Sequence, residues 1–146
     1  MKKTALSLLL FFCVQLLRAQ TPEDSVKAVV NKLFAAMKAS DAAALDACFT
    51  NAALLQSVTA NGEVRNEEVK EFAKQIASLP KDSADERIVF ETVKVDANLA
   101  VVWAPYQFYY AGKFSHCGVD SFQLIREGGQ WKIHYLIDTR RKKGCQ

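Results

Sequence analysis

The stretch Asp120-Ser-Phe-Gln-Leu-Ile-Arg-Glu-Gly-Gly-Gln-Trp-Lys-Ile-His-Tyr135 has the pattern of two β-strands joined by a tight turn. Apolar residues recur at every second position on both sides of Gly128-Gly129. This period of two is typical of strands with one buried face, and a Gly-Gly pair between such runs is typical of a β-hairpin. We therefore predict strands over residues 114–126 and 130–139.

The register of this hairpin decides which side chains share a face of the sheet. If Glu127 pairs with Gln130, one face carries the pairs Leu124 with Ile133, Phe122 with Tyr135, and Asp120 with Ile137. A preceding hairpin that turns at Gly112 adds residues of the strand before it, namely Ala100, Val102, Ala104, Tyr106, Phe108 and Tyr110. This face is the more apolar one, so we assign it to the concave side of a curved sheet, where it would line a pocket. An irregularity is expected at Pro105, because proline cannot donate to a strand pair, and a bulge there would bring in Trp103 and Tyr109 instead.

Upstream of these strands, apolar residues recur at helical spacing. Thr21-Pro22 is typical of a helix start, Ser40 can cap a second helix, and Asn66 can begin a third. The elements predicted from these patterns are helices over residues 22–38, 40–48 and 66–79 and strands over residues 52–59, 87–96 and 99–111. The predicted fold class is therefore α+β, with three N-terminal helices packed on a strongly curved, mostly antiparallel sheet.

This order of elements resembles the nuclear transport factor 2-like superfamily, over residues 22–139. The similarity is carried by the hairpin quoted above, by Asn98-Leu-Ala-Val-Val-Trp103, and by the early pattern Phe34, Asp41, Leu45, Phe49 and Ala53. The chain looks like the lumazine-binding-like branch and the SnoaL-like branch of polyketide cyclases. The resemblance implies a cone fold, in which the sheet curls around the first helix and leaves a pocket at the wide end. It implies fold more than function, because members include isomerases, dehydratases, cyclases and transport factors.

The first 19 residues have the pattern of a cleavable secretory signal. Met1-Lys2-Lys3 is basic, residues 5–17 are almost wholly apolar, and Ala19 is a small residue at the expected cleavage site. The apolar run is shorter than the roughly 20 residues that span a membrane. We predict export to the periplasm or outside a bacterial cell, no stable membrane anchor after cleavage, and a single domain over residues 20–146 with a short basic C-terminal tail.

The net charge of the precursor is misleading. The whole chain has 19 Lys and Arg against 16 Asp and Glu, but three of the bases and none of the acids fall in the predicted signal. The exported domain is therefore close to neutral, and nucleic acid is not an expected partner.

Asp120 is the main candidate for chemistry, because it is a carboxyl group on an otherwise apolar face. Burial would raise its pKa toward the range of a general acid or base, with Tyr135 or Tyr106 as a partner. A purely structural role, as a hydrogen-bond acceptor at the sheet edge, is the alternative. His116 could reach the pocket mouth, whereas His134 falls on the opposite face. Two histidines without a carboxylate cluster predict no metal site, and no motif predicts a cofactor.

The cysteines and the tail give two further predictions. Export would favour a disulfide, and Cys117 and Cys145 are the expected pair, because Gly144 would let the tail fold back, while Cys48 is expected to be buried. Asp138 and Arg140 share a face of the last strand and are expected to pair with each other or a partner, or else to belong to a solvated tail.

Three functions are compatible with these patterns. The first is a non-catalytic exported domain that binds a small apolar or aromatic molecule, as a homodimer through outward aromatic side chains on the convex sheet face. The second is a lyase or isomerase that uses Asp120 with Tyr135 or Tyr106. The third is a dimeric interaction domain whose pocket is filled by its own side chains. A cavity above about 300 Å³ would favour the first two.

Overall fold

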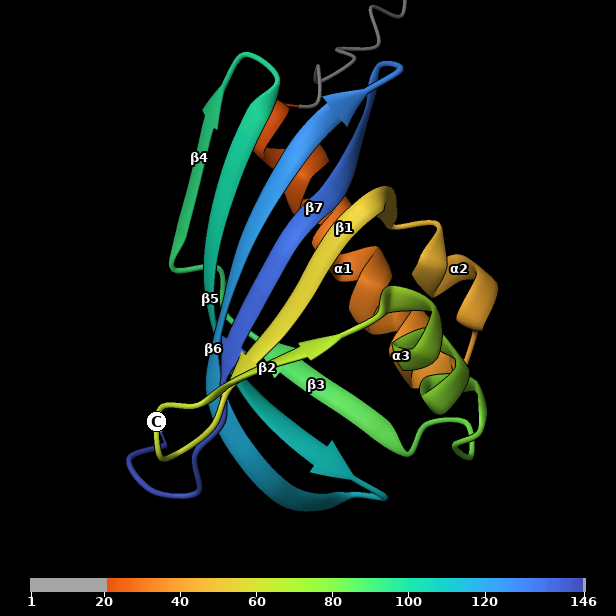
Figure 1. Ribbon diagram of the computed structural model, residues 1–146, viewed down its shortest axis with the longest axis vertical. Helices are drawn as coiled ribbons and strands as arrows, with labels where there is room; N and C mark the ends of the chain where they lie inside the picture. Colours follow the sequence, from red (N-terminus) through yellow and green to blue (C-terminus); the bar gives the residue numbers. More distant parts are fainter. Residues whose placement is uncertain (1–20, 146) are drawn as a thin grey trace, which may run out of the picture.

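The computed structural model describes residues 21–145 and contains three helices and seven strands (Figure 1). The helices are α1 (Pro22–Ala39), α2 (Ala42–Asp46) and α3 (Val69–Ala77). The strands are β1 (Phe49–Val58), β2 (Val64–Glu67), β3 (Ala84–Ile88), β4 (Thr92–Asp96), β5 (Leu99–Tyr110), β6 (Lys113–Glu127) and β7 (Gln130–Thr139). The predicted secretory signal lies outside the described residues. No helix within residues 21–145 is long and apolar enough to cross a membrane.

The seven strands form one curled sheet with the order β2-β1-β7-β6-β5-β3, and β4 pairs with the other end of β5. Only β1 and β7 run parallel, and every other pair of neighbouring strands in this sheet is antiparallel. All three helices lie on the same side of the sheet, which curves around α1 (Figure 1). The predicted α+β class, with helices on a curved and mostly antiparallel sheet, is confirmed.

The first helix begins where its capping residues predict. The Thr21 side chain accepts a hydrogen bond from the Asp24 amide at 3.1 Å, and Pro22 occupies the first turn, where no amide donor is needed. Ser40 does not cap the second helix as predicted. It ends α1 in a left-handed conformation with φ 56°, and Asp41 caps α2 by accepting from the Ala44 amide at 2.9 Å.

Two of the predicted elements are divided differently in the structure. The strand predicted over residues 87–96 is two strands, β3 and β4, which pair with different halves of β5. The carbonyl of Pro105 accepts a hydrogen bond from the Val89 amide. The nitrogen of Pro105 faces the same neighbouring segment, but it carries no proton and cannot donate the second hydrogen bond of a strand pair. The partner strand breaks there, while Pro105 stays in register with Val119 on its other side. Residues 64–67 form β2, so the third helix begins at Val69 rather than at Asn66.

The last hairpin forms as predicted at its tip, but its register shifts further along. Glu127 pairs with Gln130 and Leu124 with Ile133. A bulge then places Gln123 opposite Tyr135, because His134 is an extra residue on β7. Beyond the bulge Phe122 faces Leu136 and Asp120 faces Asp138, so the predicted pairing of these residues with Tyr135 and Ile137 is wrong.

The core lies between α1 and the concave face of the sheet. Phe122, Leu124 and Ile133 are completely buried, and the ring of Phe34 packs edge-on against Phe122 with 6.2 Å between the ring centres. Each such side chain contributes about 1.5–3 kcal/mol by leaving water. This core holds α1 on the sheet. A cavity remains beside it, near the C-terminal ends of α1, β5 and β7.

The C-terminal tail is tied to the start of β6. Cys117 and Arg141 exchange two backbone hydrogen bonds of 2.9 Å, and a disulfide joins Cys117 to Cys145, the pair expected from the sequence. Cys48 is the free thiol within residues 21–145, and it is buried.

We expect the disulfide to be visible by thiol counting on purified protein in denaturant. Reduction should add two reactive thiols to those counted without reductant, because only Cys117 and Cys145 are bonded. An equal count with and without reductant would contradict the disulfide.

Candidate functional site

A cavity of about 140 Å³ lies between the helices and the concave face of the sheet. Its apolar side comes from α1, α3 and three strands and consists of Leu33, Phe34, Met37, Leu55, Phe72, Ile76, Phe108 and Leu136. Its polar side comes from the strands and the residue after β7 and consists of Glu67, Glu86, Tyr106, His116, Asp120, Asp138 and Arg140. The cavity therefore has one apolar wall and one wall rich in carboxyl groups.

Three of the predicted pocket residues line this cavity, namely Tyr106, Phe108 and Asp120. Val102 and Phe122 lie on the same face but belong to the solid core beside the cavity. Tyr110, the last residue of β5, is 45% exposed and lies outside the cavity lining.

Tyr135 and Ile137 lie on the opposite face of the sheet, because the bulge at His134 puts Leu136 and Asp138 on the concave side. The Tyr135 hydroxyl donates to Gln56 at 2.6 Å. Tyr135 is therefore no partner for Asp120. Tyr106, the other tyrosine considered from the sequence, is in the cavity.

Three acidic residues of the cavity were not placed there by the sequence patterns. Glu67 was predicted in the third helix but lies on β2. Glu86 lies on β3, one residue before the strand was predicted to begin, and Asp138 was expected only to pair with Arg140. Glu86 stands two residues after the buried Ala84, so extending the predicted strand backward would have assigned Glu86 to the inner face. His116 lines the cavity, as its predicted position near the pocket mouth suggested.

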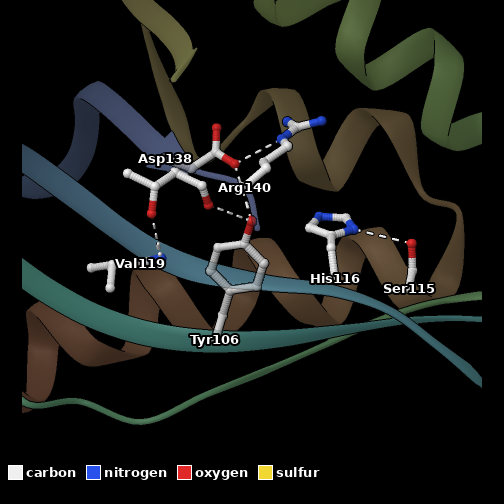
Figure 2. Close-up of polar contacts among 7 residues, drawn as sticks. Tyr106, Ser115, His116, Val119, Asp138 and Arg140 are labelled. Carbon is white, nitrogen blue, oxygen red and sulfur yellow. Dashed lines mark hydrogen bonds and ion pairs between the residues drawn. The ribbon is translucent and has the colours of Figure 1, made fainter. Parts of the chain in front are cut away.

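Asp138 is held by the side chains of Tyr106 and Arg140 (Figure 2). Arg140 Nε donates to Asp138 Oδ2 at 2.8 Å, and the Tyr106 hydroxyl lies 3.2 Å from the same oxygen. The hydroxyl also donates to the Thr139 carbonyl at 2.9 Å. Burial, and then the charge of Asp138, raise the pKa of Tyr106, so its hydroxyl keeps its proton. Of the two alternatives that the sequence left open for these residues, the structure shows the pairing of Asp138 with Arg140.

Asp120 has a different environment from that of Asp138, although the two residues are directly opposite each other on β6 and β7. Asp120 is 3% exposed, and its Oδ2 atom has no hydrogen-bond donor in the protein. Its side chain contacts the carboxyl group of Glu86, with which it can share a hydrogen bond only when one of the two acids holds a proton. Burial, and then the charge of Glu86, raise the pKa of Asp120 well above its ordinary value.

Glu86 completes this pair of acids. Burial, and to a lesser degree the charge of Asp138, raise the pKa of Glu86 to about 7, although its contact with Asp120 acts in the opposite direction. The pair therefore holds at least one proton near neutral pH, and this proton lies within a cavity wall. Within residues 21–145, no three His, Cys, Asp or Glu side chains are placed to hold a metal ion.

His116 covers one side of the cavity. Its ring stacks on Phe108 at 5.0 Å and meets Tyr106 edge-on at 5.7 Å, and Nδ1 lies 3.1 Å from the Ser115 hydroxyl. Burial, and then the positive charge of Arg140, lower the pKa of His116, so the ring is neutral at pH 7. It adds an aromatic surface to the cavity rather than a positive charge.

Two larger hollows, of about 550 and 560 Å³, lie elsewhere on the described part of the chain. One lies between the start of α1 and the tip of the β6–β7 hairpin, and the other lies near the disulfide, beside the break between β3 and β4. Neither is lined by a buried polar atom that lacks a partner among residues 21–145, whereas the smaller cavity is. We therefore take the smaller cavity as the candidate site.

The model of a protein family described as "Putative lumazine-binding" matches residues 21–135. This chain belongs to that family. The match includes the whole cavity wall from α1 to β6 and ends before Asp138 and Arg140. No curated protein matches the sequence.

Solved structures with the same fold share little sequence with this chain. An NTF2-like protein of unknown function from Silicibacter pomeroyi is 20% identical, with a TM-score of 0.65 over 80% of this chain and 93% of that one. An NTF2-like protein of unknown function from Shewanella oneidensis is 16% identical, with a TM-score of 0.66 over 82% and 99%. A protein of unknown function with a cystatin-like fold from Nostoc punctiforme is 10% identical, with a TM-score of 0.67 over 84% and 95%. The fold is therefore NTF2-like, as its sequence resemblance implied, and this family relation leaves the ligand open.

Proposed function

We propose that this protein is an exported domain that binds a small, mostly apolar molecule in the cavity beneath α1 and α3. The observation that carries the proposal is Asp120, a carboxyl group that is 3% exposed and has one oxygen without a donor in the protein. A buried acceptor without a partner costs about 1–3 kcal/mol, and more when it is charged. A ligand with a hydrogen-bond donor would remove that cost.

The size of the cavity limits the ligand. A volume of about 140 Å³ is below the roughly 300 Å³ that is typical of pockets for drug-sized ligands. It is close to the engineered cavity of about 150 Å³ that takes up benzene. We therefore propose a ligand with a body the size of a single ring and one polar end, rather than a large aromatic compound.

Binding of a neutral single-ring probe tests this function. We expect benzyl alcohol to raise the unfolding temperature of the protein by a few degrees, because a ligand at ten times its Kd adds about 1.4 kcal/mol to the free energy of unfolding. Leu55→Phe should abolish the shift, since Leu55 lines the cavity and a larger side chain would fill it. Leu54→Phe is the matched control, because Leu54 is 61% exposed on the other face of β1. A shift that is absent in the wild type, or unchanged in Leu55→Phe, would count against the cavity as a binding site.

A proton-transfer enzyme, such as a lyase or isomerase, is the second candidate function. It is favoured by the pair Glu86 and Asp120, because an acid with a pKa of about 7 in a buried site can both accept and donate a proton at neutral pH. Tyr106 replaces Tyr135 as the third participant. Mass spectrometry of small molecules that copurify with the wild type and with Asp120→Asn separates the two functions. The same compound in both would support binding alone, and a substrate retained only by the variant would support catalysis.

Export and a homodimer remain predictions. The convex face supports the second of these, because Leu99, Val101 and Trp103 are all at least 39% exposed on one face of β5. Apolar side chains grouped in this way are typical of surfaces that a partner covers.

A further inference from the structure

We propose that the ligand of this cavity is a small organic cation, in which a protonated amine is attached to an apolar body about the size of one ring. Its ammonium group would lie against Glu86 and Asp120. This inference rests on the proposed function, that the cavity binds a small molecule, and it adds the charge and the chemical class of that molecule.

Carboxyl groups outnumber permanent cations in the described lining of the cavity. The titratable groups that face it come from five elements and the residue after β7, and they are Glu67, Glu86, Tyr106, His116, Asp120, Asp138 and Arg140. Tyr106 and His116 are neutral at pH 7, so four carboxyl groups face one permanent cation among the described lining residues. The helices α1 and α3 add only apolar side chains to the lining. The cavity therefore favours a positively charged occupant.

Arg140, the one permanent cation in the described lining, already forms an ion pair with Asp138. Arg140 Nε lies 2.8 Å from Asp138 Oδ2, and the Tyr106 hydroxyl approaches the same oxygen from the other side (Figure 2). Asp120 lies directly opposite Asp138 on the neighbouring strand, where two negative charges repel each other. Asp120 and Glu86 thus remain as a pair of acids without a cation.

The geometry of Asp120 points to a donor from outside the protein. Its side chain is almost completely buried, it lines the cavity, and its Oδ2 atom has no donor in the protein. An ammonium group has three N–H donors and no acceptor, so one such group can satisfy two neighbouring carboxylates at once. A neutral hydroxyl has one donor and leaves the second acid unpartnered.

The opposite wall suits the rest of an amine. Phe34, Phe72 and Phe108 line the cavity together with Leu136 and Met37. Aromatic faces attract cations in sites that exclude water, and apolar side chains favour an apolar body. An anion would find only Arg140, which is already paired with Asp138 through Nε, among four carboxyl groups.

A cation would also displace the proton that the acid pair shares. In the empty cavity Glu86 and Asp120 hold this proton because burial, and then the negative charges of neighbouring acids, raise their pKa values. An ammonium group between them favours the ionised form of both, so each amine that binds should release at least about one proton to the solvent near pH 6. Proton release is a readout that a neutral ligand would not give.

Three probes of similar size and different charge test the inference by isothermal titration calorimetry on the purified protein. We expect benzylamine to bind at least about tenfold more tightly than benzyl alcohol at pH 7, and benzoate to show no binding, since a charge-assisted hydrogen bond is worth more than a neutral one. Titrations at pH 6 in two buffers of different ionisation enthalpy should show that at least about one proton is released per benzylamine bound, and none per benzyl alcohol.

Matched variants test whether the ammonium group of the ligand binds at Asp120 and Glu86. Asp120→Asn should weaken the binding of benzylamine by about tenfold more than that of benzyl alcohol, because the amine loses a charge-assisted hydrogen bond and the alcohol only a neutral one. Asp96→Asn makes the same change of charge at the exposed end of β4 and should leave both affinities unchanged. If Asp120→Asn does not fold, as judged by circular dichroism, Glu86→Gln is used with the same expectation, and Glu91→Gln becomes its control.

The outcomes separate this inference from the function on which it rests. Tighter binding of benzylamine with proton release that depends on Asp120 or Glu86 supports the cation site. Binding of benzyl alcohol that equals or exceeds that of benzylamine overturns the cation site and leaves a neutral binding pocket. Binding of none of the three probes overturns both proposals.

Discussion

Gly118→Ala is expected to destabilise the protein by about 3 kcal/mol or more, which is a large share of the roughly 5–15 kcal/mol that is typical of a folded domain. A Cβ atom at Gly118 would lie 1.7 Å from the backbone carbonyl oxygen of Thr139 and 2.7 Å from the ring of Tyr106. The first of these contacts is with backbone, so no side-chain rotation relieves it. The end of β7 would have to move away from β6. Unfolding in urea, followed by circular dichroism, measures the loss.

Gly62→Ala is the matched control for this substitution. Gly62 has φ +85° and no atom within 4 Å of the added Cβ, so it should cost only the strain of a left-handed backbone, about 1–2 kcal/mol. If Gly118→Ala costs no more than Gly62→Ala, the close approach of the two strands does not hold in solution.

The position of Gly118 links stability to the candidate site. Tyr106 packs over Gly118, and its hydroxyl reaches Thr139 and Asp138 because no side chain separates the strands there. Any other residue would push Tyr106 and Asp138 apart. A folded fraction of Gly118→Ala is therefore expected to have a disturbed polar wall.

The fold could be predicted because its signals are local. Gly128-Gly129 lies between two runs of period two, and Thr21-Pro22 precedes a run of helical period, so neighbouring residues alone indicate the elements. The order of the elements then leaves few ways to cover one face of a curved sheet with helices. The break between β3 and β4 was not predicted, because it depends on Pro105 in a different strand.

The candidate site could be predicted only in part, because it depends on registers far from the turns. Because His134 is an extra residue on β7, the inner face carries Leu136 and Asp138 where the predicted register placed Tyr135 and Ile137. Nothing in the alternation of polar and apolar residues marks this bulge. The predicted pocket was therefore more apolar than the real one, and the opposition of Asp120 and Asp138 was missed.

Glu86 was missed for a related reason. A charged residue in phase with Ala84 and Ile88 contradicts the expectation that an inner strand face is apolar, and the predicted strand began three residues too late, at Arg87 instead of Ala84. Residues that break the local pattern are frequent at functional sites, where stability is given up for chemistry. Glu86 and Asp120 both break the pattern, and they lie together in the cavity.

The free energy of unfolding is expected to fall as pH rises from 5 to 8, by roughly 2–3 kcal/mol from Glu86 alone, and Glu86→Gln should remove most of this fall. The pKa of Glu86 rises from 4.5 in the unfolded chain to about 7 in the folded protein. The folded state therefore binds more protons between these pH values, and stability is lost as pH rises through this window. The raised pKa of Asp120 acts in the same direction. Urea unfolding at pH 5, 6, 7 and 8 measures the slope.

The ionisable neighbours of Glu86 and Asp120 determine the pH range in which a loss of stability can be attributed to these two acids. His116, whose pKa is lowered, acts in the opposite sense and costs stability as pH falls below about 6.5, so the region from pH 6.5 to 8 isolates the acids. Arg140 stays charged and Tyr106 stays neutral throughout this range. Glu91→Gln, an exposed change of the same kind, should keep the wild-type slope. An identical slope in Glu86→Gln would mean that no shared proton lies in the cavity. If the wild type and Glu91→Gln lose stability between pH 6.5 and 8 but Glu86→Gln does not, the proton that a cationic ligand would replace depends on Glu86.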